Sequence, residues 1–85
     1  MYIVVHHHIS DQAKFWEIAQ GMMANLPEGL KLPSVFPAAD ASEAICLWEA
    51  DSLDAVRRPL ESALGHVCKN DYFEVDAQNA IGLPR

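Results

Sequence analysis

The chain has 85 residues, of which 51% are hydrophobic, and its formal net charge is −6. This length is that of one domain, and the hydrophobic content is too high for a disordered chain. Six Lys and Arg against twelve Asp and Glu argue against a nucleic-acid-binding surface, and because no stretch is apolar enough to span a membrane and no secretory leader begins the chain, we expect a cytoplasmic protein.

A strand is predicted from Tyr2 to Ile9, and it carries three consecutive histidines. Apolar, mostly β-branched residues precede the histidines and Ile9 follows them, which is typical of a strand and not of an expression tag. Because a strand sends alternate side chains to opposite faces, His6 and His8 share one face and His7 points to the other.

Helical periodicity follows this strand. Either Ser10 or Asp11 can cap the helix, since both offer a side-chain oxygen to the free backbone N–H groups of the first turn. Residues 26–29, Leu-Pro-Glu-Gly, end the helix. Its apolar stripe, at three- and four-residue spacing, consists of Phe15, Ile18, Ala19, Met22, Met23 and Leu26.

Two strands are predicted next. Residues 31–37 form an edge strand or an extended loop, because Pro33 and Pro37 lack the N–H that a central strand donates. Residues 43–50 form a strong strand with Ile, Cys, Leu and Trp at its centre.

A second helix and a last strand complete the pattern. Asp51 or Ser52 caps this helix, and Gly65 suits a left-handed position at its end. Residues 71–76 form the last strand, and residues 77–85 form a tail without periodicity. The apolar stripe of the second helix consists of Leu53, Val56, Leu60 and Leu64.

The predicted element order is β-α-β-β-α-β, which makes an α+β domain of residues 1–76 followed by the tail. In this split βαβ arrangement both helices cover one face of a four-stranded antiparallel or mixed sheet. We expect the first and third strands to lie side by side and parallel, with the fourth strand antiparallel to the first.

Alternation along the strands assigns side chains to the two faces. The opposite register of residues 43–50 stays an alternative, because a slip of one residue exchanges the faces. The helix-covered face is predicted to hold Ile3, Val5, Ile9, Cys46, Trp48, Phe73 and Val75. The open face is predicted to hold Tyr2, Val4, His6, His8, Ile45, Leu47, Glu49, Tyr72, Glu74 and Asp76.

The open face is predicted to be too apolar for water. Tyr2, Val4, Ile45, Leu47 and Tyr72 would form a patch of roughly a few hundred Å², which is typical of an interface. A homodimer with the two sheets packed face to face buries this patch, and the tail can then lie across the partner.

The stretch Cys46-Leu47-Trp48-Glu49-Ala50-Asp51-Ser52-Leu53-Asp54-Ala55 has the pattern of a strand followed by the start of a helix. Together with the element order from Tyr2 to Glu74, it resembles the small ferredoxin-like proteins that form dimeric α/β barrels. That group includes cofactor-independent monooxygenases, haem-degrading enzymes, stress-response proteins and small metal-binding proteins. The resemblance implies a ferredoxin-like fold and a dimer, and since the group has many functions it implies no single chemistry.

The main functional hypothesis is a metal site on the open face. With parallel pairing, Glu49 lies beside His6 and His8, and the fourth strand brings Glu74 from the other side. Two imidazoles at positions i and i+2 of a strand can ligate one ion, and carboxylates complete a mixed nitrogen and oxygen set. The pattern therefore predicts a divalent transition metal (Ni, Zn, Cu or Fe) bound by His6, His8, Glu49 and Glu74.

Two alternatives stay open. In a non-catalytic interaction module, the histidines satisfy hydrogen bonds in a polar interface without any metal. The resemblance to monooxygenases implies instead a cavity between sheet and helices for a flat, aromatic small-molecule ligand, with His7 as proton acceptor. Its expected lining is His7, Phe15, Trp16, Trp48 and Phe73.

Overall fold

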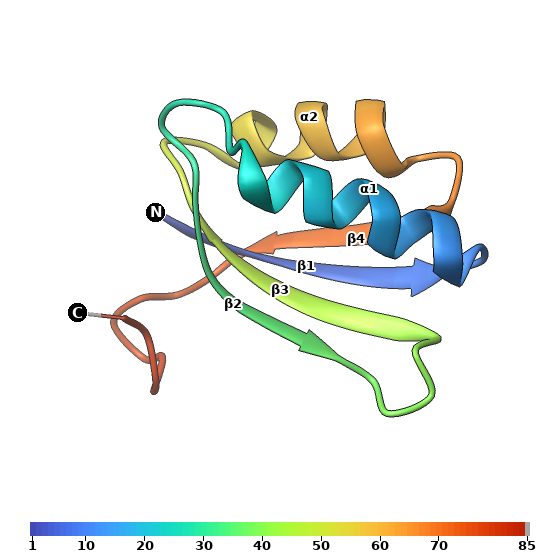
Figure 1. Ribbon diagram of the computed structural model, residues 1–85. Helices are drawn as coiled ribbons and strands as arrows, with labels where there is room; N and C mark the ends of the chain where they lie inside the picture. The colour runs from blue at the N-terminus through green and yellow to red at the C-terminus, as the bar shows by residue number, and fades with distance from the viewer. Residues whose placement is uncertain (85) are drawn as a thin grey trace.

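Two helices lie on one face of a four-stranded sheet in the computed structural model, which describes residues 1–84 (Figure 1). The elements in chain order are β1 (Tyr2–Ile9), α1 (Gln12–Ala24), β2 (Lys31–Pro37), β3 (Glu43–Glu49), α2 (Leu53–Leu64) and β4 (Cys68–Glu74). This is the predicted ferredoxin-like βαββαβ arrangement. Within residues 1–84, neither α1 nor α2 has the length and hydrophobicity of a membrane-spanning helix.

Side-chain caps begin both helices. Asp11 accepts a hydrogen bond from the backbone N–H of Lys14, and Ser52 accepts one from that of Ala55. The prediction for the end of α2 is wrong, because Gly65 has a right-handed backbone with φ −59° and ψ −19°.

The strands have the order β2-β3-β1-β4, and each neighbouring pair is antiparallel. The prediction that β1 and β3 run parallel is therefore wrong. A helix returns the chain to its starting edge, so it makes β1 parallel to β2, and the short turn after β2 then reverses β3. As a result His8 lies opposite Glu43, and Glu49 lies opposite Tyr2 at the other end of the pair.

The faces of β4 are also opposite to the prediction. Tyr72 pairs with Val5 on the helix-covered face, whereas Phe73 pairs with Val4 on the open face. Because opposed residues share a face, Glu74, which pairs with Ile3, also leaves the open face. The strand begins at Cys68 and not at residue 71, and the buried Cys68 sets the alternation.

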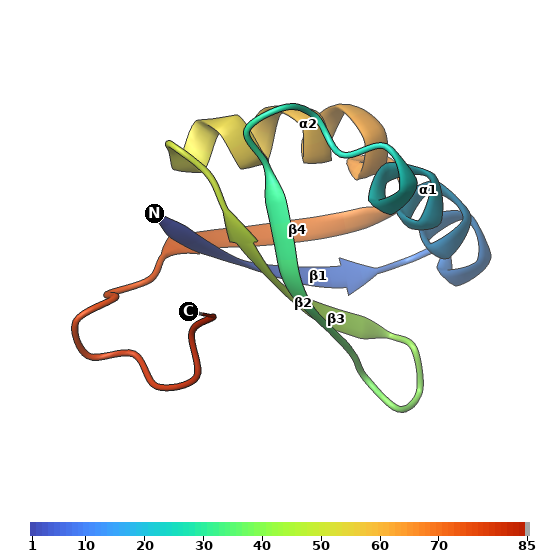
Figure 2. The same cartoon turned by 60° about the vertical axis from the view of Figure 1, so that its left-hand side comes forward.

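The core lies between the sheet and the helices, and the faces predicted for β1 and β3 are confirmed. The sheet twists, so that β2 and β3 cross the direction of β1 and β4 in Figure 2. The buried side chains from the two central strands are Ile3, Val5, His7, Ala44, Cys46 and Trp48. On the open face, Phe36, Ile45 and Phe73 are 65%, 39% and 56% exposed.

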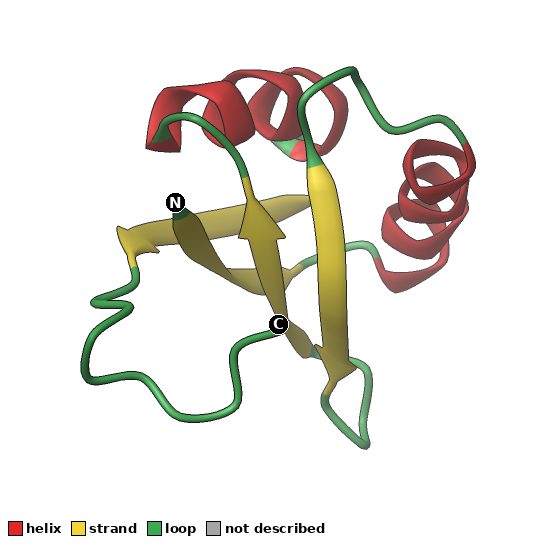
Figure 3. Cartoon of the chain, turned by 90° about the vertical axis from the view of Figure 1, so that its left-hand side faces the viewer, coloured by secondary structure: helices red, strands yellow, loops and turns green. Residues whose placement is uncertain are grey.

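The tail leaves β4 and curls back beneath the open face (Figures 1 and 3). The Val75 N–H donates to the Tyr2 carbonyl oxygen at 2.8 Å, and the Tyr2 hydroxyl donates to the Pro84 carbonyl oxygen at 3.3 Å. Ile81 is fully exposed between these two contacts. That the tail covers a partner chain stays a prediction, and residue 85 lies outside the described part.

Candidate metal centre

Two neighbouring imidazoles form the centre of the site, near the carboxyl end of β1. The His6 and His8 rings lie on the open face as predicted, with ring centroids 4.1 Å apart and an angle of 35° between their planes. This proximity follows from the strand itself, because residues two apart share a face.

Glu43 completes the group. Its Oε1 lies 2.7 Å from His6 Nε2, and its backbone pairs with His8 across the β1–β3 ladder. His6, His8 and Glu43 each offer one ligand atom, and these three atoms lie within 4.8 Å of one another. The group is open to solvent, with the His6 side chain 33% and the Glu43 side chain 49% exposed.

A second carboxylate comes from the opposite neighbour of β1. Asp71 of β4 pairs with His6 in the ladder, and its Oδ2 lies 3.0 Å from His8 Nε2. Each histidine thus has a carboxylate partner from a different strand. Exposed ion pairs of this kind contribute only about 0–1 kcal/mol to stability. Their main effect is therefore that the carboxylates hold the two imidazole rings in place.

Two of the predicted ligands lie elsewhere. Glu49 is on the open face but opposite Tyr2, four ladder positions from His6, which is roughly 13 Å along the strand. Glu74 is on the other face. Glu43 was not predicted because β3 was expected to run parallel to β1, and Asp71 was not predicted because the two faces of β4 were assigned the other way round. The short turn over residues 38–42 was the signal that β3 runs the other way.

His7 belongs to a separate, buried network. It is 2% exposed, and its Nδ1 lies 2.5 Å from Asn70 Oδ1, so it is a hydrogen-bonded histidine of the core. Burial lowers the pKa of His7, although the hydrogen bond with Asn70 opposes this effect. The network continues outward, since Asn70 Nδ2 and the Tyr72 hydroxyl both donate to Glu61 of α2.

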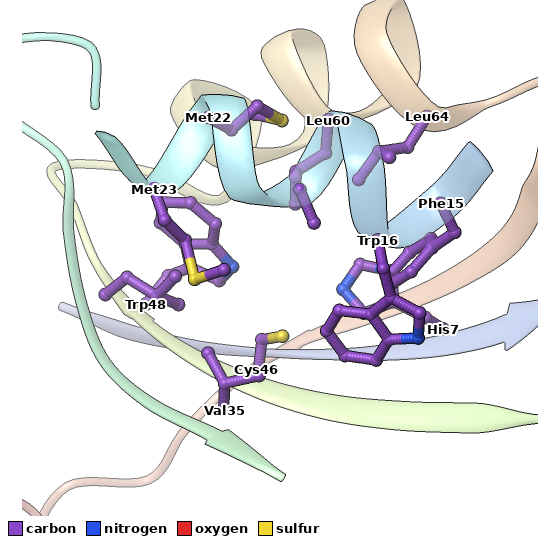
Figure 4. Close-up of a pocket in the computed structure, with 12 residues that line it drawn as sticks. His7, Phe15, Trp16, Met22, Met23, Val35, Cys46, Trp48, Leu60 and Leu64 are labelled. Carbon is purple, nitrogen blue, oxygen red and sulfur yellow. The ribbon is translucent and has the colours of Figure 1, made fainter. Parts of the chain in front are cut away.

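His7 also borders a cavity between the sheet and the helices (Figure 4). Four of the five side chains expected there, those of His7, Phe15, Trp16 and Trp48, do line it. Phe73 does not, because it lies on the open face. A cavity therefore lies at the predicted place with a corrected lining, and that it holds a flat aromatic ligand stays a prediction.

The chain matches no protein-family model, no curated protein and no solved structure. The resemblance to dimeric α/β barrel proteins therefore stays a prediction, and the functional argument rests on the geometry of the side chains.

Proposed function

We propose that the protein binds a divalent transition metal ion through His6, His8 and Glu43. The observation that carries this proposal is the convergence of their three ligand atoms within 4.8 Å. Two imidazoles and a carboxylate form a mixed nitrogen and oxygen set, which suits Ni, Zn, Cu or Fe.

The site needs little rearrangement to hold an ion. Ligand atoms bound at about 2.0–2.2 Å from one ion lie roughly 3–3.5 Å from each other, so atoms that lie within 4.8 Å of one another have to close by at most about 1–2 Å. These side chains are partly exposed and can rotate by this amount. Asp71 supports the site by its contact with His8, as carboxylates commonly orient metal-ligating histidines.

Calorimetric titration of protein without an affinity tag tests the proposal. We expect saturable binding of one ion per chain for at least one of Ni²⁺, Zn²⁺ and Cu²⁺, with Kd tighter than about 100 μM. Binding should weaken as the pH falls through about 6, because an imidazole must lose its proton before it ligates a metal.

Variants identify the ligands. The double change His6→Ala and His8→Ala should abolish binding, and Glu43→Gln should weaken it by about tenfold or more. Glu49→Gln is the matched control, since Glu49 lies on the same face of β3 at its other end. A Glu49→Gln loss equal to that of Glu43→Gln, or no saturable binding of any of the three ions, would contradict the proposal.

A further inference from the structure

The cavity between the sheet and the helices is almost wholly apolar. Its lining includes the rings of His7 and Trp48, whose nitrogens can form hydrogen bonds. It has a volume of about 30 Å³, and Met23 of α1, which lines it, is 41% exposed. Figure 4 shows His7 and Trp48 reaching it from the sheet, opposite Leu60 and Leu64 of α2. The full lining is His7, Phe15, Trp16, Ala19, Met22, Met23, Leu32, Val35, Cys46, Trp48, Leu60 and Leu64.

Trp48 brings an unused donor to this cavity. The side chain is 3% exposed, and its Nε1 is buried without any hydrogen-bond partner, the one such side-chain atom among residues 1–84. Roughly nine in ten or more buried polar groups in proteins are paired, so an unpaired indole N–H inside a cavity wall is an exception that a ligand can explain. The indole nitrogen lies on the cavity side of the ring in Figure 4.

His7 offers a second polar atom, the acceptor nitrogen Nε2. The hydrogen bond between Nδ1 and Asn70 decides which ring nitrogen has the proton. The Asn70 Nδ2 donates to Glu61 Oε2 at 2.7 Å, and a carboxylate only accepts, so the Asn70 amide oxygen must face His7. That oxygen accepts from His7 Nδ1 at 2.5 Å and from the Cys68 thiol at 3.1 Å. The proton of the neutral ring is therefore on Nδ1, and the lone pair is on Nε2.

We propose that the cavity binds a compact, neutral, mostly apolar molecule with one hydroxyl group, which accepts a hydrogen bond from Trp48 Nε1 and has His7 Nε2 as its second polar contact. A carboxylate or an ammonium group is excluded because the walls offer no compensating charge. The cavity must widen, since one that holds benzene has about 150 Å³. The flexible Met22 and Met23 side chains, with three rotatable bonds each, are suited to move aside.

Phenol and toluene are matched probes, because they have nearly the same shape and only phenol has the hydroxyl group. The readout is the indole N–H resonance of Trp48 in ¹⁵N-labelled protein, assigned with Trp48→Phe and Trp16→Phe. With phenol we expect a saturable shift with Kd tighter than about 10 mM. Toluene should bind about fivefold more weakly, the factor expected for one lost hydrogen bond. A chelator in all samples makes the result independent of the metal proposal.

Two variants and one further signal complete the test. Ala19→Leu fills the cavity from α1 and should abolish phenol binding in a folded protein. Asn70→Ala removes the acceptor of the His7 Nδ1 proton, so it should change the ¹⁵N shifts that mark the Nδ1–H tautomer. Equal binding of phenol and toluene would overturn the proposal, as would the absence of a saturable Trp48 shift. A long-lived water molecule on Trp48 Nε1 that phenol does not displace would likewise identify the cavity as part of a hydrated core.

Discussion

Three consecutive histidines have three different environments. Side chains of β1 point alternately to the two faces of the sheet, and β1 has β3 on one side and β4 on the other. His6 contacts Glu43 from β3, His8 contacts Asp71 from β4, and His7 is buried against Asn70. The first two are partly exposed and can each offer a ring nitrogen to a metal ion, whereas the third is held in one tautomer inside the fold.

Glu61 is the residue whose charge state should affect stability in acid. Hydrogen bonds from Asn70 and Tyr72 lower its pKa in the folded protein, and a group with a lowered pKa stabilises the fold above its ordinary value. This contribution is lost as the pH falls from about 5 through the lowered folded pKa. Since Glu61 is exposed, we expect an effect below about 1 kcal/mol.

Urea unfolding at pH 7 and at about pH 3 measures this effect for wild-type protein and Glu61→Gln. The wild-type free energy of unfolding should fall more between the two pH values than that of Glu61→Gln. Glu74→Gln, which removes an exposed carboxylate of β4, should retain the wild-type dependence. Equal dependence in wild type and Glu61→Gln would mean that these hydrogen bonds do not hold the carboxylate ionised.

The elements themselves were predictable from the sequence, but their pairing was only partly so. Local signals set the helices and strands: the 3.6-residue and two-residue periodicities and the caps at Asp11 and Ser52. Strand direction and register depend instead on contacts between distant segments. Tyr72 and Phe73 are adjacent and both aromatic, so alternation could not decide which of them faces the helices, and this error also misplaced Glu74.

Gly21 in α1 and Gly65, which follows the last residue of α2, should respond to alanine in opposite directions. A Cβ at Gly65 would lie 2.6 Å from the backbone oxygen of Glu61, so the backbone at the end of α2 would have to shift. We expect Gly65→Ala to lower the free energy of unfolding by about 1–3 kcal/mol. A Cβ at Gly21 meets no atom within 4 Å, so Gly21→Ala in α1 should raise it by about 0.5–1 kcal/mol. Urea unfolding of both variants checks the signs, and a neutral or stabilising Gly65→Ala would refute the crowding argument.

At the scale of the whole molecule, one face of the sheet has helices and the other has none among residues 1–84 (Figure 3). A chain of this size buries only about 60–65% of the surface that it exposes when unfolded, so further burial is valuable. The open face has three large, exposed apolar side chains, those of Phe36, Ile45 and Phe73. Leu47 of β3 is half-buried on the same face. Phe73 takes the place that the sequence reasoning gave to Tyr72 in this patch.

We expect the open face to associate with that of a second copy, as the sequence predicted. Analytical ultracentrifugation should give a dimer at micromolar concentration. Leu47→Glu should give a monomer, because pairing would bury a carboxylate against apolar side chains at a cost of several kcal/mol. Gln20→Glu makes the same charge change at an exposed position of α1, away from the open face, and should leave the dimer intact. A wild-type monomer at these concentrations would refute the dimer.

The central claim is that a metal ion binds where His6, His8 and Glu43 converge. Anomalous diffraction tests it most directly, with crystals grown in the ion that calorimetry shows to bind and data recorded at the absorption edge of that metal. The account predicts one strong anomalous peak on the open face, about 2.0–2.2 Å from one ligand atom of each of these three residues. A peak beside Glu49 or Glu74 alone, or no peak near His6 and His8 in crystals that contain the metal, would contradict it.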